Sequence, residues 1–229
     1  MATIYSNPRT DEYEILHDAY YGSGMFASGA AITPHRREGI ESINFRRQIA
    51  YYLNYTGPIL NASVDPIFKD EIKREYSNSV LFDEFINDVD REGTTLQEFT
   101  RQNATLAKLY GVMYIVVDNV TEFGNSLADT LANRSMPYLT AVEPKNVMNF
   151  TFDDNGRLSV FTYATYLANA DGTVKTHYHT WTPTSWNIKD SDGKTIGEGE
   201  HNIGRIPIVQ WFGRAARKRD ILPPPEYLS

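Results

Sequence analysis

The stretch LAKLYGVMYIVVDN, residues 106–119, constrains the fold more than any other part of the chain. Its first residues have the spacing of an amphipathic helix that ends at Tyr110 and Gly111. The apolar run from Val112 to Val117 follows directly and is mostly β-branched or aromatic, which favours a buried strand. Asp118 and Asn119 end that run. The chain is therefore expected to change from helix to strand at a single glycine.

Helical patterns dominate the sequence before Gly111. Asn7 and Pro8 offer an N-cap and a first helical position, and the periodic pattern that follows ends at Gly22, where a flexible glycine-rich connector begins. Four further apolar segments are expected: a helix from residue 36 or 37 through Leu53 to a break at TGP (56–58), a segment over 59–68, a helix over 80–89 that Gly93 ends, and a helix from a Thr95–Glu98 capping box to Tyr110.

Hairpin patterns dominate the sequence after Val117. Asn-Gly at 155–156 and Asp-Gly at 171–172 and 192–193 separate short segments rich in β-branched and aromatic residues. These dipeptides favour tight hairpin turns, which require positive φ. LSVFTYATYL and TVKTHYHTWT are therefore expected to be adjacent antiparallel strands. Helices followed by strands predict an α+β fold with a mainly antiparallel sheet.

The same boundaries predict the organisation of the chain. Residues 1–35 are expected to form an N-terminal helix and the glycine-rich connector. Residues 36–229 are expected to form one α+β domain, with helices over 36–110, a sheet over 111–213 and a proline-rich tail after it.

Composition excludes several classes of function. The formal net charge of −7 disfavours a surface that binds nucleic acid along its whole extent. The absence of Cys excludes disulfides, thiolate catalysis and Cys-ligated metal. No signal peptide is expected at the N-terminus, and no apolar run approaches the roughly 20 residues of a membrane helix. These features favour a reducing intracellular compartment and no membrane partner.

Three patterns resemble ligand sites and are weighed against simpler interpretations. DVDREGTTLQEF (88–99) starts like a calcium loop, but its last position is Phe99, and a helix end followed by a capping box explains the same residues. GKT (193–195) lacks the first glycine of a phosphate loop. His177 and His179 share one strand face and would need a third zinc ligand such as His201. No catalytic, cofactor-binding or metal residue is assigned, and an enzyme is not expected.

Four strings carry a resemblance to a known family. In chain order they are YYLNYTGPILNASVDPIF, GTTLQEFTRQNATLAKLYGVMYIVVDN, PYLTAVEPKNVMNF and EHNIGRIPIVQWF. Together they resemble the N-terminal half of portal proteins of tailed double-stranded DNA bacteriophages, over roughly residues 40–225. Their order and spacing carry the resemblance, because no single string is diagnostic.

The resemblance implies a structural virion component. Portal proteins form a dodecameric ring at one capsid vertex, through which the genome is packaged and ejected. The helix–Gly111–strand unit would belong to the wing, an α+β region that packs against neighbouring subunits and capsid protein. No cofactor is implied. The virion, and the host cytoplasm during assembly, are the implied locations.

The resemblance also implies partners that lie beyond these residues. In the family, a proline-rich stretch like LPPPEYL leads into the stem, which lines the channel, and the clip, which meets the terminase motor and head-completion proteins. The sequence stops at Ser229, at that point. Channel lining and motor docking are therefore not expected of these residues, and the chain alone is expected to be a monomer or a weak oligomer.

A binding module for nucleic acid or a phage accessory protein is the alternative. The basic run GRAARKRD supports it through four side chains that would contact DNA: Arg214, Arg217, Lys218 and Arg219. A run this short is more often a solvated loop.

Overall fold

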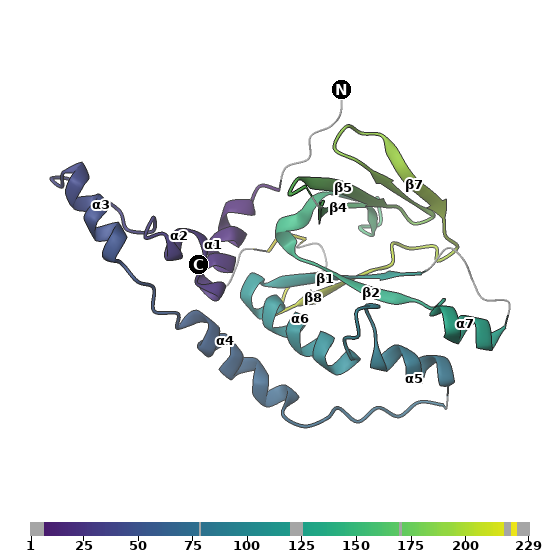
Figure 1. Cartoon of the computed structure of the whole chain (residues 1–229). Helices are drawn as coiled ribbons and strands as arrows, with labels where there is room; N and C mark the ends of the chain where they lie inside the picture. Colours follow the sequence, from purple (N-terminus) through teal and green to yellow (C-terminus); the bar gives the residue numbers. More distant parts are fainter. Residues whose placement is uncertain (1–6, 78, 120–125, 170, 218–220, 224–229) are drawn as a thin grey trace.

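The computed structural model describes residues 7–77, 79–119, 126–169, 171–217 and 221–223. Two antiparallel sheets and a set of helices form three layers, with the smaller sheet between the larger sheet and the helices (Figure 1). The helices are α1 (Thr10–Tyr21), α2 (Gly24–Ala27), α3 (Ile40–Ile49), α4 (Thr56–Val64), η1 (Asp65–Phe68), α5 (Val80–Asn87), α6 (Leu96–Tyr110), α7 (Leu127–Asn133) and η2 (Pro144–Asn146). The strands are β1 (Val112–Asp118), β2 (Tyr138–Val142), β3 (Val147–Phe152), β4 (Leu158–Ala168), β5 (Val174–Trp181), β6 (Ser185–Lys189), β7 (Thr195–Glu200) and β8 (Ile208–Phe212).

The smaller sheet is built around β1 and has the order β2-β1-β8. One face of β1, with Val112, Tyr114 and Val116, packs into the core between the two sheets. The other face contacts the helices, where Met113 and Ile115 are buried. A strand covered on both faces is apolar throughout, which explains the continuous run seen in the sequence. The helix–Gly–strand prediction is confirmed.

The larger sheet is a meander with the order β3-β4-β5-β6-β7. The three Gly-containing dipeptides lie between consecutive strands of this sheet, as predicted, and their glycines have positive φ. β4 and β5 pair antiparallel in the register Phe161↔Trp181 to Ala168↔Val174. The α+β fold with mainly antiparallel strands is therefore confirmed, but the strands form two packed sheets where one was expected.

Helix α6 covers the outer face of the smaller sheet. Its N-terminus is capped by the Thr95 side chain, which accepts from the Glu98 N–H, and its C-terminus by Gly111 at φ 88. Leu109 and Tyr110 bury against Tyr13 of α1 and Leu60 of α4. Tyr13 and Tyr110 meet edge to face, with ring centroids 6.0 Å apart.

Residues 221–223 form a short strap that joins α1 to the core between the two sheets. Ile221 is 2% exposed and belongs to the inter-sheet core. Its carbonyl accepts a hydrogen bond from the Tyr114 hydroxyl, and the Pro223 carbonyl accepts one from the Tyr13 hydroxyl at 3.1 Å. The start of the proline-rich tail is thus part of the core.

Several expected helix boundaries are wrong. Pro58 lies in the first turn of α4, so TGP begins a helix instead of breaking one. The first four N–H groups of a helix have no partner within it, and proline loses nothing there. The helix before it ends at Ile49, which leaves Leu53 outside any helix.

One further helix boundary is wrong. Helix α5 ends at Asn87, and Val89 is buried in the loop that follows it, where its N–H donates to the Thr94 carbonyl at 2.9 Å. Val89 packs with Phe99 and Ile115, so it is apolar because of tertiary burial and not because of helical periodicity. Helix α7 lies within residues 111–213, for which the sequence predicts a mainly antiparallel sheet.

Candidate functional site

Residues 24–68, here called the arm, run from α2 to η1 and carry α3 away from both sheets (Figure 1). The arm is attached to α1 at residues 52–54, which follow α3. The Tyr52 hydroxyl donates to the Ala19 carbonyl at 2.9 Å, and the Asn54 side chain donates to the Tyr20 carbonyl at 2.6 Å. Buried Leu60 then joins α4 to the cluster around Tyr13. The arm is therefore fixed to α1 near its return and extends from there.

The far part of the arm is held by its own loop. Arg47 donates to the Ile32 carbonyl at 3.1 Å, and Arg46 pairs with Glu38 at 3.0 Å. Gly29 has φ 72, and a Cβ there would lie 2.5 Å from the Arg47 carbonyl oxygen. Only glycine fits this close approach, which folds the loop 28–38 back onto α3.

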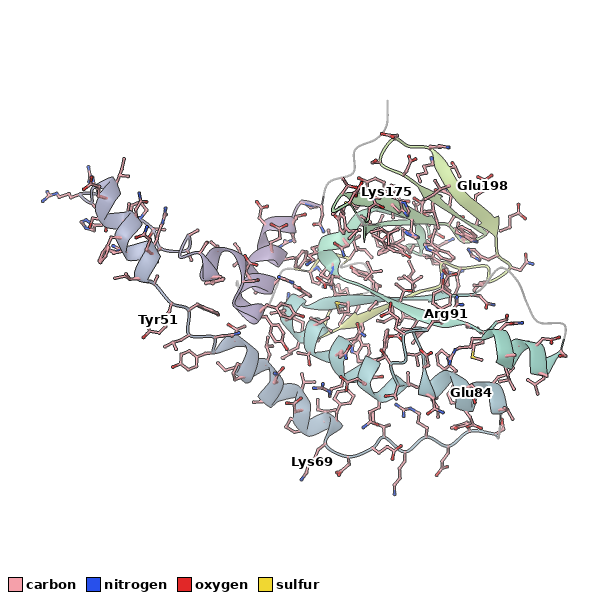
Figure 2. All side chains as sticks on the ribbon, viewed as in Figure 1. Tyr51, Lys69, Glu84, Arg91, Lys175 and Glu198 are labelled. Carbon is pink, nitrogen blue, oxygen red and sulfur yellow. The ribbon has the colours of Figure 1, made fainter. Side chains whose placement is uncertain are left out.

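The arm exposes large apolar side chains along most of its length (Figure 2). Tyr51 is 80% exposed, and the others are each more than half exposed: Ile40, Phe45, Ile49, Leu53, Tyr55, Ile59 and Ile67. Single exposed apolar residues are normal on a protein surface, but a series of them on one projecting segment marks a contact surface. The arm is the first candidate site.

The basic run is only partly described by the structure. Arg214 is half-buried just after β8, and Arg217 is exposed; both take part in interactions with other groups. Lys218 and Arg219 lie outside the described residues. The glycine before the run, Gly213, is locked in place because its N–H donates to the Gly111 carbonyl at 3.0 Å.

The histidines and the loop 88–99, which resemble metal sites in the sequence, make hydrogen bonds and ion pairs within the protein. Within the described ranges, no group of three His, Asp or Glu side chains is placed to hold a metal ion. His179 shares a hydrogen bond of 3.0 Å with the Thr165 hydroxyl, and His201 one of 2.9 Å with the Thr182 carbonyl. In the loop 88–99, the Asp88 carboxylate accepts from the Gly93 N–H and pairs with Arg134.

No helix in the described part of the chain is long and apolar enough to cross a membrane.

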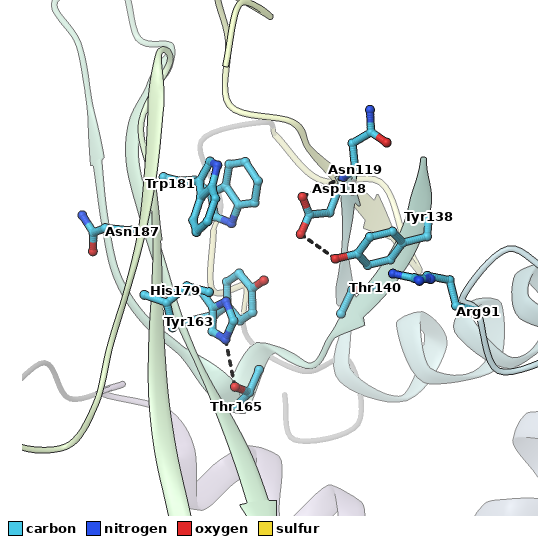
Figure 3. Close-up of a pocket in the computed structure, with 12 residues that line it drawn as sticks. Arg91, Asp118, Asn119, Tyr138, Thr140, Tyr163, Thr165, His179, Trp181 and Asn187 are labelled. Atoms are coloured by element: carbon cyan, nitrogen blue, oxygen red, sulfur yellow. Dashed lines mark hydrogen bonds between the residues drawn. The ribbon is translucent and has the colours of Figure 1, made fainter. Parts of the chain in front are cut away.

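A cavity of about 360 Å³ opens between the two sheets, beside the end of β1 (Figure 3). A second hollow of about 550 Å³ adjoins it and shares Asp118, Asn119, Trp181 and Trp186 with it. Figure 3 shows the side chains of two walls that face each other across the cavity. This cavity is the second candidate site, and the sequence analysis did not identify it.

One wall of the cavity comes from the smaller sheet. The Tyr138 hydroxyl donates to the Asp118 carboxylate at 2.9 Å, and the Arg91 guanidinium lies 5.5 Å from the centre of the Tyr138 ring. Burial raises the pKa of Tyr138 to about 12, with a further contribution from the Asp118 charge. Among the described residues, no cation lies within ion-pair distance of Asp118.

The other wall is aromatic and comes from the larger sheet. Tyr163 and His179 stack with their rings 8° from parallel and centroids 4.9 Å apart. Trp181 and Trp186 form a tilted pair at 6.4 Å. Gly199 on β7 makes room for Trp186, because a Cβ there would lie 2.9 Å from the indole ring. Burial lowers the pKa of His179, so its ring is neutral at pH 7.

Neither a scan against protein-family models nor a search of curated proteins gave a match to this chain.

Proposed function

We propose that this chain is a structural component of a virion, equivalent to the wing of a phage portal protein, and not an enzyme. The observation that carries the proposal is the arm, whose apolar side chains remain exposed in the single chain. In a ring, the arm would be covered by a neighbouring copy or by capsid protein. The virion, and the host cytoplasm during assembly, are the proposed locations.

The energetics favour a contact made by the arm as a unit. Covering one large apolar side chain contributes about 1.5–3 kcal/mol. Association has a rigid-body cost of about 4–15 kcal/mol. One side chain cannot offset that cost, whereas three together, such as Phe45, Ile49 and Tyr51, contribute about 4.5–9 kcal/mol and exceed the lower part of that range. The family resemblance also implies three other partners: the terminase motor, head-completion proteins and genomic DNA. In the family these partners contact the stem and the clip, so they are not proposed as partners of residues 1–229.

Site-specific cross-linking tests the proposal. The chain has no Cys, so Ile49→Cys introduces a single thiol on the arm that can carry a photoactivated cross-linker. Val174→Cys on β5 is the matched control, because Val174 is 60% exposed and Ile49 is 61% exposed. We expect the arm label to capture a second copy, or capsid protein, in a concentration-dependent way, and the β5 label to capture much less. Equal capture from both positions would show that the arm is not the contact surface.

The alternative, nucleic-acid binding through residues 214–219, has a separate test. A gel-shift titration of the chain with duplex DNA at low and high salt would reveal it, because phosphate contacts weaken steeply with salt. A shift that disappears in the Arg214→Ala, Arg217→Ala double variant would favour that function over the structural one.

A further inference from the structure

The cavity between the sheets combines two features that together suit one class of ligand. Its aromatic wall presents Trp181, Trp186 and Tyr163, and its opposite wall presents the Asp118 carboxylate. In Figure 3, Asp118 points across the cavity toward Trp181, and the Tyr163 hydroxyl points toward the wall that carries Tyr138. We propose that this cavity binds a compact organic cation, an alkylated ammonium or a guanidinium group, between the tryptophans and Asp118.

The charge of the cavity supports a cation. Burial is the main cause that raises the pKa of Tyr138 and Tyr163, and the negative charge of Asp118 adds to the shift on both walls. The faces of aromatic rings are also negative and attract cations within about 6 Å. Two sources of negative potential therefore face the same space. The positive Arg91 guanidinium also lines the cavity but lies over the Tyr138 ring, and among the described residues no cation pairs with the Asp118 carboxylate.

The chain itself supplies a first example of this chemistry. The Arg91 guanidinium lies over the Tyr138 ring at the edge of the cavity. Arg91 has φ 68, which is unusual for a residue with a side chain. Arg91 contacts the Tyr138 ring, and no cation of the described residues lies over Trp181 or Trp186.

The construction of the aromatic wall also fits a binding site. Trp186 lies over Gly199 and close to Gly197, whose added Cβ would lie 3.4 Å from the indole. The two glycines alternate along β7 and leave one flat surface beneath the ring. The cavity volume of about 360 Å³ lies within the range of about 300–1,000 Å³ that is usual for small-molecule sites. The neutral ring of His179 adds no repulsion for a cation at pH 7.

A matched pair of ligands tests the proposal without any mutation. Choline and its uncharged isostere 3,3-dimethylbutan-1-ol have nearly the same shape and differ in charge. Each is titrated into the full chain by calorimetry, with tryptophan fluorescence as a second signal, and methylguanidine is titrated as the guanidinium probe. We expect one or both cations to bind and the neutral isostere to bind at least about tenfold more weakly.

Two variants locate the site. Asp118→Asn keeps the shape and an acceptor for the Tyr138 hydroxyl, although not the second oxygen that accepts from the Asn119 N–H, and we expect it to weaken cation binding about tenfold or more. Asp154→Asn, in the exposed turn between β3 and β4, changes the net charge equally and should leave binding unchanged. Equal binding of choline and its isostere would overturn the proposal, as would the failure of both cations to bind or an unchanged affinity in Asp118→Asn.

Discussion

At the scale of single residues, two tyrosine hydroxyls join the strap to the rest of the core. Tyr114 is completely buried on β1 and donates to the Ile221 carbonyl. Tyr13 is completely buried on α1 and donates to the Pro223 carbonyl. Burial raises the pKa of both phenols far above the usual value, so both remain donors at any ordinary pH. The strap is held by neutral hydrogen bonds, which salt does not screen.

Tyr114→Phe should therefore lower the free energy of unfolding by about 1–3 kcal/mol, because it removes the hydroxyl that donates to the buried Ile221 carbonyl. Chemical denaturation measures the change. Tyr166→Phe is the control: Tyr166 is 55% exposed on β4, and its replacement should change stability by less than about 0.5 kcal/mol. Similar losses in both variants would show that the strap does not depend on this hydrogen bond.

Gly111 is a second critical residue, because φ 88 is a conformation that other residues reach only with strain. Gly111→Ala should cost about 1 kcal/mol or more, seen as a lower melting temperature. Gly57→Ala is the control, and it is not expected to lower the melting temperature. Gly57 lies in α4 with no left-handed φ, and an added Cβ meets its nearest atom at an ordinary 3.5 Å, so alanine should be neutral or stabilising.

His179 gives stability a dependence on pH. Partial burial is the main cause that places its pKa below the ordinary 6.5, and the neighbouring His177 adds to the effect. The unfolded chain therefore binds a proton at His179 more readily than the folded protein. The free energy of unfolding should be unaffected by this group above pH 6.5 and should fall as the pH drops below 6.5. Denaturation curves at pH 7.5 and 5.5 should differ less in His179→Gln than in the unchanged chain.

At the scale of elements, β1 determines how the layers meet. It pairs with β2 on one edge and with β8 on the other, and its two faces belong to different clusters. Ile115 is 7% exposed on the helix side, whereas Val117 is 36% exposed near the end of the strand. The sequence predicts that Met113, Ile115 and Val117 share one face, but only the first two are buried there.

Ile115→Ala should lower the free energy of unfolding by about 2–5 kcal/mol, because it leaves a cavity against Val89 and Phe99. Val117→Ala removes a smaller side chain from a more exposed position on the same strand and should cost less than about 1 kcal/mol. Equilibrium unfolding in urea compares the two. A loss below about 1 kcal/mol for Ile115→Ala would mean that α5 and α6 can close over the gap.

Local signals in the sequence predict the elements whose causes are local. The Gly111 cap, the Thr95 cap and the three Gly-containing turns depend on residues within one turn of the chain, and all are confirmed. The pairing of β1 with β8 joins Val112 to Phe212, and no local pattern specifies it. The cavity was missed for the same reason, because its lining residues come from different strands and meet only when the two sheets pack.

At the scale of the whole molecule, the exposed arm and the net charge have opposite effects on self-association. The arm presents apolar side chains that favour association, whereas the net charge of −7 makes copies repel each other. We expect a monomer at micromolar concentration and association only at higher concentration, with a contact in the weak class below about 1,200 Å². Sedimentation velocity over a concentration series measures this, and added salt should strengthen the association by screening the repulsion. A stable dodecamer at micromolar concentration would contradict the expectation.

The central position of β1 also has a consequence for the order in which a ribosome makes the chain. The partners of β1 on its second edge, residues 208–212, emerge about 90 residues after it, and the strap that receives the Tyr114 hydroxyl emerges later still. Until then the nascent chain carries an apolar strand with one unpaired edge. The smaller sheet is therefore expected to close only after residues 208–223 have left the ribosome, and until then the partly made chain is most exposed to aggregation and to capture by chaperones.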